Sequence, residues 1–232
     1  MALKDDLQSA VKKIFHDDRW TIRDGNVVPE PENLGLGNDG VNLNGAVLYA
    51  DISGSTQLVD TATPTFAAEV YKAYLACAAK IIKNEVGVIT AYDGDRVMAV
   101  FKGEAMCTNA VSAALKIKGA VGTIIQPALK AEYPQTNYVL KHVIGIDTSK
   151  LLASRIGVRN DNDLVWVGRA ANYAAKLTTL SDEFSIWITG SVYDSIQDAV
   201  KFAKQTNVWK EYSWTAMNKM RIYACGAWKI DV

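Results

Sequence analysis

The stretch Gly45-Ala-Val-Leu-Tyr-Ala-Asp-Ile52 is followed directly by Ser53-Gly-Ser-Thr56. The first eight residues are mostly apolar, and a short run of this kind predicts a buried β-strand. The next four residues are small and mostly carry hydroxyl groups, which predicts a tight turn. Asp51 stands near the end of the predicted strand, just before the turn. The stretch therefore predicts a core strand that brings one carboxylate to the edge of a sheet.

The segments that follow predict how this strand is covered. Thr63-Pro64 is an N-cap followed by proline at the first helical position, and the predicted helix ends near Gly87. Asp93-Gly94 is a strong hairpin signal between two apolar runs. The remaining pattern predicts helices over 104–121 and 168–180, strands over 138–146, 164–167 and 185–188, and a polar loop over 147–162. The order β-α-β-β-α-β predicts an α+β, ferredoxin-like sandwich with extra strands at the C-terminus.

The N-terminal residues have a different pattern. Residues 2–18 place apolar side chains at helical spacing with charged residues between them, which predicts an amphipathic helix. Its apolar stripe consists of Leu3, Leu7, Val11, Ile14 and Phe15. This stripe either packs on the main domain or pairs with another helix. Residues 24–44 are rich in Gly, Asn and Pro, so we expect an N-terminal helix and loop arm over 1–44 and a main domain over 45–232.

Composition limits the classes of partner. The 232 residues contain 25 Lys+Arg and 25 Asp+Glu, so the formal net charge is zero. This balance argues against a broad basic surface for nucleic acid but not against a compact site for one small anion. No long apolar run or signal-peptide pattern is present, so we expect no membrane contact. Cys77, Cys107 and Cys225 are widely spaced in apolar surroundings and predict reduced core thiols in a cytoplasmic protein.

Two aspartates form a candidate metal site. Asp51 lies near the end of the first strand, and Asp95 follows Gly94 at the tip of the hairpin. If the hairpin lies beside the first strand, both carboxylates reach one edge of the sheet. Two like charges that close together are unfavourable unless a cation neutralises them, and hard oxygen ligands suit Mg²⁺ or Mn²⁺. For each residue alone, a turn or capping role is the favoured explanation, and the metal site depends on the pair.

Two further segments are candidate anion contacts. The small residues of the turn 53–56 leave backbone N–H groups free to converge on an anion. Asn172 and Lys176 are four residues apart, so they project from the same face of the predicted helix. An amide and a cation there could hold a ribose oxygen and a phosphate. The spacing is also typical of a solvated lysine and a capping asparagine.

Together and in this order, these segments resemble the class III nucleotidyl cyclase catalytic domain. That family has Asp-Ile-x-Gly-x-Thr after an apolar strand, Gly-Asp before a second apolar strand, and Gly-x-x-x-Asn-x-x-x-Arg in a helix. The corresponding segments here are Asp51–Thr56, Gly94–Phe101 and Gly168–Lys176. The resemblance covers about residues 45–225 and implies that the main domain is a nucleotidyl cyclase catalytic domain.

The resemblance implies a metal site. Asp51 and Asp95 take the places of the two metal-binding aspartates of the family, and the Ile52 carbonyl takes the place of a further ligand. Two Mg²⁺ or Mn²⁺ ions per site are implied, together with a nucleoside triphosphate as substrate.

The resemblance also implies how the substrate is held. The family's triphosphate cradle corresponds to Ser53, Gly54, Ser55 and Thr56. Asn172 takes the place of the residue that orients the ribose, and Lys176 that of an arginine that acts in the transition state. Family members are dimers with sites at the interface. A homodimer is therefore implied, in which Asp51 and Asp95 face Asn172 and Lys176 of the partner chain.

Three positions depart from the family pattern. Purine-reading members usually have Lys where this chain has Ala91, and Asp or Thr where it has Val165. Neither Ala91 nor Val165 can hydrogen-bond to a base edge, so this route to purine selection is lost. Lys176 in place of Arg replaces a fork of donors with a point charge. The combination of both metal-binding aspartates with a changed base pocket resembles the bacterial pyrimidine cyclases of Pycsar antiphage defence. Those proteins make cyclic UMP or cyclic CMP, which activates a separate effector.

Two residues fit that resemblance further. Tyr49 lies two residues before Asp51 on the same strand face and could narrow the pocket for a smaller base. Arg96 follows Asp95 and could contact the base or a phosphate; otherwise Tyr49 is a core aromatic and Arg96 a solvated residue. We expect cyclisation of UTP to cyclic UMP and pyrophosphate. Open alternatives are a cytidylate cyclase, an adenylate cyclase with an atypical base pocket, and a dead nucleotide-binding pseudo-cyclase.

Overall fold

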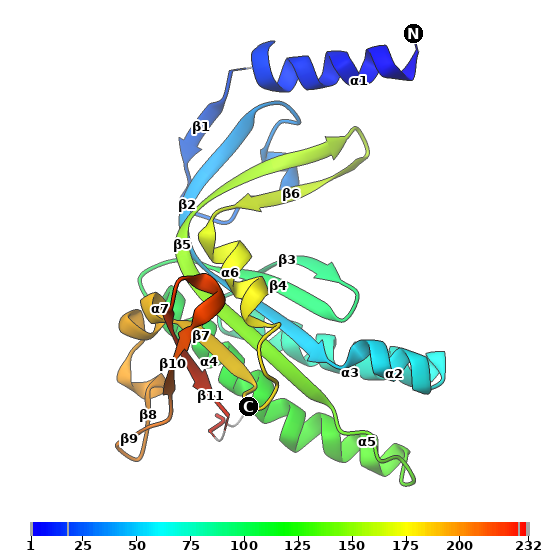
Figure 1. The fold of residues 1–232 in the computed structure, drawn as a ribbon, viewed down its shortest axis with the longest axis vertical. Helices are drawn as coiled ribbons and strands as arrows, with labels where there is room; N and C mark the ends of the chain where they lie inside the picture. Colours follow the sequence, from blue (N-terminus) through cyan, green and yellow to red (C-terminus); the bar gives the residue numbers. More distant parts are fainter. Residues whose placement is uncertain (1, 18, 227, 231–232) are drawn as a thin grey trace. The chain divides into compact units, whose positions relative to one another are not determined.

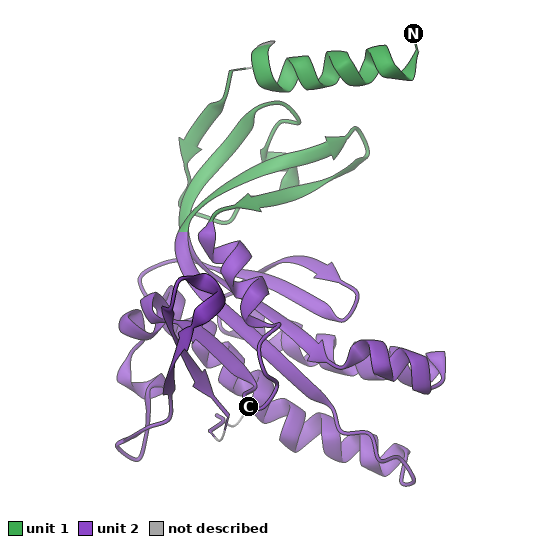
Figure 2. Ribbon diagram, in the orientation of Figure 1, with its two compact units in different colours: residues 1–44, 150–168 green, residues 45–149, 169–232 purple. Residues whose placement is uncertain are grey.

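The computed structural model describes residues 2–17, 19–226 and 228–230. The chain forms two compact units (Figure 2). Unit 1 contains residues 1–44 and 150–168, and unit 2 contains residues 45–149 and 169–232. The two long strands, β2 (Asp39–Ser53) and β5 (Lys141–Val158), each contribute to both units.

The sheet of unit 2 has the predicted ferredoxin-like arrangement (Figure 1). Its strand order is β10-β11-β7-β5-β2-β4-β3, so β5, β2, β4 and β3 follow the 4-1-3-2 order of that fold. Strand β7 pairs in parallel with β5, and β4 pairs antiparallel with β2 and β3. Besides β2 and β5, these strands are β3 (Val88–Asp93), β4 (Arg96–Phe101), β7 (Ile186–Thr189), β10 (Lys210–Trp214) and β11 (Met220–Cys225). A separate short hairpin comprises β8 (Phe202–Ala203) and β9 (Thr206–Asn207).

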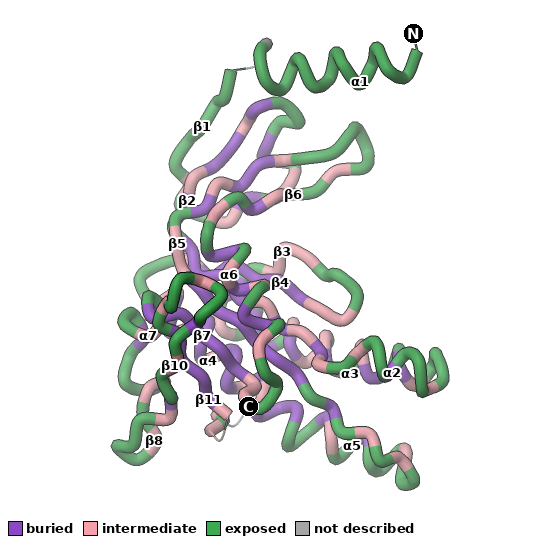
Figure 3. The backbone as a smooth tube through the Cα atoms, viewed as in Figure 1, coloured by how far each residue is buried: buried purple, intermediate pink, exposed green. Residues whose placement is uncertain are grey.

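Helices cover both faces of this sheet. Helices α3 (Pro64–Asn84) and α4 (Met106–Ala120) pack on the face that receives the even-numbered side chains of β2 from Ala46 to Ile52. Helix α6 (Arg169–Leu177) packs on the opposite face, where Leu177 contacts the cluster that includes Val143 and Trp187. Figure 3 shows the buried backbone concentrated in these strands and helices. Odd-numbered residues of β2 therefore lie on the α6 face.

Local sequence signals were reliable for helix starts and the hairpin. The Thr63 hydroxyl accepts a hydrogen bond from the Phe66 amide, and Pro64 is the first residue of α3, as expected. Gly94 has a φ of 60°, which a side chain would disfavour, and it lies in the predicted turn. The hairpin does lie beside the first strand, with Ala50 opposite Val97.

Two segments predicted as loops are strands. β2 begins at Asp39 rather than Gly45, and β5 runs on to Val158 through most of the predicted loop 147–162. The polar composition of these residues wrongly predicted a loop, because their polar groups form hydrogen bonds with residues that are distant in the sequence. The Ser154 hydroxyl, for example, donates to the Asp39 carbonyl at 2.8 Å. A predicted polar loop can therefore be a strand when its polar groups have partners.

Other helices begin or end at residues that differ from the predicted ones. The helix predicted over 104–121 begins at Met106 and continues beyond α4 through a π-helical turn, η3, and a further helix, α5. Part of the Ser-Gly-Ser-Thr turn is helical, since α2 begins at Ser55. These elements, with one more unpredicted helix, are α2 (Ser55–Thr61), η3 (Val121–Ile125), α5 (Gln126–Glu132) and α7 (Gly190–Ser195).

Unit 1 contains the predicted N-terminal helix and a small sheet. Helix α1 (Leu3–Lys12) continues as a π-helical turn, η1 (Lys13–Asp17). Strand β1 (Thr21–Asp24) pairs in parallel with the first residues of β2, and β6 (Asp161–Val167) pairs antiparallel with the last residues of β5. Within the described residues, none of the helices combines the length and apolar character needed to cross a bilayer.

Candidate active site

Strand β2 presents Tyr49 and Asp51 on the α6 face of the sheet. Both side chains are half-buried, whereas their neighbours Leu48, Ala50 and Ile52 are buried in the core. The strict alternation of a β-strand produces this arrangement. The side chain of Ile52 belongs to the core, so only its backbone carbonyl is available as a ligand.

The β3–β4 hairpin brings Asp95 close to Asp51. The pKa of Asp51 is raised to about 6, first because burial disfavours the charged form and second because the negative charge of Asp95 lies nearby. Arg96 and a hydrogen bond from Thr178 lower it in part. One carboxylate oxygen of Asp95, Oδ2, is buried without a hydrogen-bond partner. The two aspartates are therefore a coupled and incompletely satisfied pair.

A buried tyrosine of α3 also interacts with this pair. Tyr74 is fully buried, and its hydroxyl has no hydrogen-bond partner. Its pKa is raised well above the usual value, first by burial and then by the charges of Asp51 and Asp95. The sequence offered no signal for this residue beyond its place in the apolar stripe of the helix. Its presence shows that the aspartates rest on a poorly hydrated part of the core.

The aspartate pair fits a divalent cation bound together with substrate. The charge of Arg96 compensates these two close carboxylates only in part, since the pKa of Asp51 stays raised and one buried oxygen of Asp95 is unsatisfied. Among the described residues, no group of three or more His, Cys, Asp or Glu side chains could form a closed metal cage. Mg²⁺ is commonly held by one or two carboxylates plus substrate phosphates, so a site of this size suits it.

The raised pKa of Asp51 predicts a pH effect on the metal-free protein. The folded protein holds a proton on Asp51 up to about pH 6, whereas the unfolded chain loses it near pH 4. The stability that this group contributes is thus fully present below about pH 4 and is lost as the pH rises through 6. With EDTA present, we expect the Tm of wild type relative to Asp51→Asn to fall between pH 4.5 and 7.

Comparing the two proteins at each pH removes the contributions of other groups. One such group is His142, whose pKa burial lowers to about 4 and which therefore acts in the opposite direction. A Tm difference that stays constant from pH 4.5 to 7 would contradict the assignment for Asp51.

Arg96 and Tyr49 lie against each other. The Arg96 guanidinium is 5.4 Å from the centre of the Tyr49 ring, and its Nη2 donates to Asp93 Oδ2 at 2.7 Å. Its Nε is buried and has no hydrogen-bond partner. The positive charge of Arg96 also acts on Asp51. The structure thus brings both residues to the aspartate pair, with one donor of Arg96 still unused.

The Ser-Gly-Ser-Thr turn begins two residues after Asp51. Gly54 adopts the left-handed conformation with a φ of 74° and forms the N-cap of α2. The Ser53 hydroxyl donates to Asp182 Oδ2 at 3.1 Å, and Lys141 lies 3.3 Å from the same oxygen. These bonds from Ser53 and then Lys141 lower the pKa of Asp182. Asp182 was not a predicted site residue, because it lies 129 positions from Ser53 in the sequence.

Helix α6 carries the remaining predicted residues. Asn172 and Lys176 are exposed and lie one turn apart on the same face of the helix. Among the described residues, no hydrogen bond or ion pair joins either side chain to Asp51 or Asp95. The end of the helix is closer, since the Thr178 hydroxyl is 3.5 Å from Asp51 Oδ2. One copy of the chain thus presents two separate groups of predicted residues.

Close packing and a buried ion pair hold α6 in place. A Cβ atom at Gly145 would lie 2.1 Å from the Ala174 carbonyl oxygen, so the helix rests directly on β5. Asp147 is fully buried; it accepts from Arg169 Nε at 3.0 Å and from the Thr189 hydroxyl at 2.5 Å. Arg169 is the first residue of α6, so this pair attaches the beginning of the helix to the sheet.

Removing the cation of this pair is expected to destabilise the fold. Among the described residues, Arg169→Ala leaves the buried carboxylate of Asp147 with Thr189 as its remaining side-chain donor. We expect the free energy of unfolding to fall by about 2–3 kcal/mol. Urea denaturation measures the change. Arg221→Ala, which breaks an exposed pair with Asp194, is the matched control and should cost less than about 1 kcal/mol. Equal losses in the two variants would show that the buried pair has no special role.

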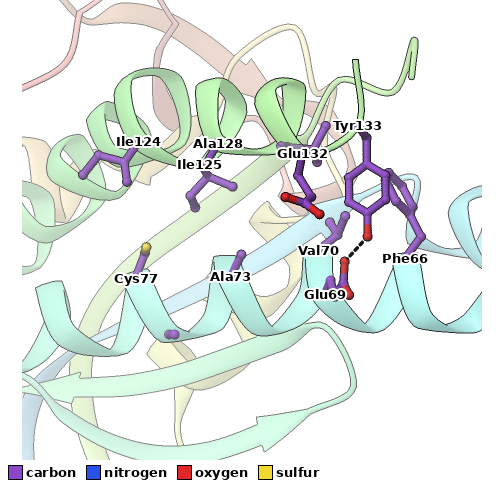
Figure 4. A pocket seen from close by; sticks show the side chains of 12 residues that line it. Phe66, Glu69, Val70, Ala73, Cys77, Ile124, Ile125, Ala128, Glu132 and Tyr133 are labelled. Carbon is purple, nitrogen blue, oxygen red and sulfur yellow. Dashed lines mark hydrogen bonds between the residues drawn. The ribbon is translucent and has the colours of Figure 1, made fainter. Parts of the chain in front are cut away.

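An apolar groove lies away from these residues. It has a volume of about 340 Å³ and lies between α3 and α5, with Cys77 near one end and Glu69, Glu132 and Tyr133 near the other (Figure 4). None of the predicted site residues lines it. The predicted site therefore lies at the half-buried ends of β2 and the β3–β4 hairpin and not in this groove.

Apolar side chains occupy the two positions that the family resemblance links to purine recognition. Ala91 lies on β3 opposite Met98, and Val165 lies on β6 opposite Ser154. Both side chains are partly exposed. His142 is buried beside the Tyr74 ring.

Comparisons with known proteins agree with this architecture. A family model described as the adenylate and guanylate cyclase catalytic domain matches residues 43–225. A uridylate cyclase of Xanthomonas perforans is 47% identical over 232 residues, with 100% of each chain covered. A uridylate cyclase of Burkholderia cepacia is 48% identical, with 99% of this chain and 100% of that one covered.

Solved structures show the same fold at low identity. The guanylyl cyclase Cya2 superposes with a TM-score of 0.69 at 17% identity, covering 82% of this chain and 95% of its own. The adenylyl cyclase CyaB from P. aeruginosa has a TM-score of 0.69 at 20% identity, covering 83% and 98%. Identities this low support the fold and not the substrate.

Proposed function

The chain belongs to the adenylate and guanylate cyclase catalytic domain family, and we infer that it is an enzyme that cyclises UTP to 3′,5′-cyclic UMP and pyrophosphate. The resemblance drawn from the three sequence motifs is thereby confirmed. One observation carries the choice of UTP: relatives named uridylate cyclase share 47% and 48% identity over essentially the whole of both chains.

The reaction joins two atoms of the same nucleotide. The ribose 3′-oxygen attacks the α-phosphorus, and the bond to the pyrophosphate leaving group breaks. We propose that Asp51, Asp95 and the Ile52 carbonyl hold two Mg²⁺ or Mn²⁺ ions; when bound, such ions neutralise phosphate oxygens and lower the pKa of a coordinated hydroxyl. The coupled, unsatisfied carboxylates support this assignment.

The other predicted residues would position the nucleotide. Backbone N–H groups of residues 53–56 would hold the triphosphate, Asn172 would orient the ribose, and Lys176 would balance charge on the phosphates. Because Asn172 and Lys176 are exposed and unconnected to the aspartates of their own chain, we propose that they act on the site of a partner copy. The enzyme would then be a homodimer with both sites at the interface.

The base pocket lacks the groups that read a purine. Ala91 and Val165 offer no hydrogen bond, so a purine edge would lose its partners there. Tyr49, held by Arg96, is placed two residues from Asp51 on the same strand face. We propose that Tyr49 narrows the pocket for a single-ring base and that the unused donor of Arg96 contacts that base or a phosphate.

Product analysis tests the proposal directly. The purified protein is incubated separately with UTP, CTP, ATP and GTP and with Mn²⁺ or Mg²⁺, and products are identified by mass spectrometry. We expect cyclic UMP to exceed the other cyclic nucleotides by at least about tenfold. Cyclic CMP or cyclic AMP as the main product would reject uridine specificity. No product from any nucleotide, with intact folding, would indicate a pseudo-cyclase.

We also propose that cyclic UMP made by this chain is a cytoplasmic second messenger that activates a separate effector in antiphage defence. The support is the resemblance to Pycsar pyrimidine cyclases. Cells carrying the gene and its genomic neighbours should resist phage infection, and Asp51→Asn should remove that resistance. Equal protection by the inactive variant would contradict the messenger role.

A further inference from the structure

The last residue of strand β2, Ser53, is bonded to a carboxylate from a distant part of the chain. Asp182 Oδ2 accepts a hydrogen bond from the Ser53 hydroxyl at 3.1 Å and lies 3.3 Å from Nζ of Lys141. Two donors therefore converge on a single carboxylate oxygen. Because these bonds lower the pKa of Asp182, its carboxylate is charged at neutral pH.

A hydroxyl and an ammonium that meet at one charged oxygen make a contact that also suits a phosphate oxygen. Lysine binds phosphate as a compact point charge, and hydrogen bonds with a charged partner are stronger than neutral ones. Ser53 lies two residues after Asp51, so the contact adjoins the candidate metal ligands. Lys141 is the first residue of β5 and is exposed, so a ligand can reach its ammonium group.

Asp182 lies in the connector between helix α6 and strand β7, and residues on both sides of it are held in place. The Ser181 carbonyl accepts a hydrogen bond from Trp187 Nε1 at 3.1 Å. The Phe184 ring packs edge-on against the Trp187 ring, with the two ring centres 5.5 Å apart. A rotation of the Asp182 side chain alone can therefore release both donors, without any opening of the connector.

The contact is weak enough for a substrate to break. The side chains of Lys141 and Asp182 are 61% and 39% exposed. An ion pair of this exposure changes an equilibrium by at most about fivefold. A triphosphate carries several negative charges where Asp182 carries one, so it attracts the same cation more strongly.

We propose that Asp182 competes with the substrate for this position. Its carboxylate binds Ser53 and Lys141 while no nucleotide is bound, and a terminal phosphate of a nucleoside triphosphate displaces it. Lys141 then contacts a phosphate bound by the same copy of the chain that supplies Asp51. The proposal rests on the proposed function only in that the turn 53–56 is taken to hold the triphosphate.

Titration with inorganic tripolyphosphate and Mg²⁺ tests the competition without a nucleotide base. Isothermal titration calorimetry gives the dissociation constants of wild type, Asp182→Asn, Lys141→Gln and the double variant. Asp182→Asn keeps the shape of the side chain but removes the competing charge, so we expect binding to tighten about fivefold. Lys141→Gln removes the cation that the phosphate gains, so we expect binding to weaken about tenfold.

The double variant separates competition from a general change of charge. In the Lys141→Gln background the contested cation is absent, so the effect of Asp182→Asn should fall to about twofold or less.

Glu183→Gln and Lys204→Gln are the matched controls. Each makes the same change of charge at an exposed position, Glu183 beside Asp182 and Lys204 between strands β8 and β9. Both should leave the dissociation constant within about twofold, because salt screens exposed charges that make no direct contact with the ligand. The Tm of each variant verifies that the fold is kept.

Four outcomes would overturn the proposal. They are equal tightening by Asp182→Asn and Glu183→Gln, an undiminished effect of Asp182→Asn in the Lys141→Gln background, and no binding of tripolyphosphate to wild type at millimolar concentrations. The fourth is weaker binding by Asp182→Asn together with a lower Tm, which is the result expected of a contact that only holds the connector.

The titration does not depend on catalysis. If no variant made cyclic UMP, the proposed function would fail while calorimetry still decided the competition. Where both hold, Asp182→Asn should also lower the KM for UTP by about fivefold, because the substrate no longer displaces a charged side chain.

Discussion

Asp51→Asn and Asp95→Asn are each expected to lower kcat for UTP by at least about 1,000-fold. Asparagine keeps the shape of the side chain but removes the charge that would hold a divalent cation. Loss of metal-based charge stabilisation of several kcal/mol corresponds to a rate loss of this size, since each 1.36 kcal/mol is tenfold. Initial rates of cyclic UMP formation at saturating UTP and Mn²⁺ measure it. Residual activity above about one tenth of wild type would reject the assignment.

Separate controls distinguish loss of the metal site from loss of the fold. Asp60→Asn removes one negative charge from an exposed position of α2 and should leave kcat within about twofold. Metal-free Asp51→Asn should melt no lower than wild type at pH 7, because it removes a half-buried charge whose pKa is already raised. Mn²⁺ binding measured by electron paramagnetic resonance should be lost in both variants without any reference to turnover.

The aspartate pair was predictable because it depends on short signals and one topological step. Asp51 lies near the end of an apolar strand, and Asp95 follows Gly94 in the hairpin turn. Pairing of the hairpin with β2, which the ferredoxin-like order requires, then brings them together. Each step uses residues close in sequence or a rule of strand order. Turn and capping signals fixed the start of α3 for the same reason.

The surroundings of the pair were not predictable, because they come from distant parts of the chain. Thr178 reaches Asp51 across 127 positions, and Asp182 reaches Ser53 across 129. Aspartate is typical of loops, yet Asp147 lies buried in β5. Its carboxylate is tolerated there because Arg169 and Thr189 donate hydrogen bonds to it. A single sequence contains no local signal for contacts of this kind, which is also why the strands beyond Asp147 resembled a loop.

Substrate choice depends on still weaker local signals. The apolar Ala91 and Val165 exclude one way of reading a purine but do not select a pyrimidine. The proposed choice of a pyrimidine rests instead on the full-length similarity to proteins named uridylate cyclase. The fold alone would not, since guanylyl and adenylyl cyclases superpose on this chain equally well, each with a TM-score of 0.69.

A mixture of two inactive variants is expected to recover about a quarter of the wild-type activity. Asp51→Ala removes one group of predicted residues, and Asn172→Ala removes the other. If each site combines Asp51 of one copy with Asn172 of its partner, a heterodimer has one site with both substitutions and one site with neither. Random exchange makes half of the dimers mixed, and each mixed dimer has one intact site of two, which gives about one quarter.

This recovery discriminates between shared sites and sites built within one chain. If Asp51 and Asn172 of the same copy acted together, every site in the mixture would carry one substitution, and activity would stay at the level of the single variants. Mixing Asp51→Ala with Asp95→Ala is the matched control. Both substitutions affect the same group of residues, so each site of that heterodimer carries one defect and no recovery is expected. Recovery in the first mixture and none in the second would place Asn172 across the dimer interface from the aspartates, as its exposed position on α6 predicts.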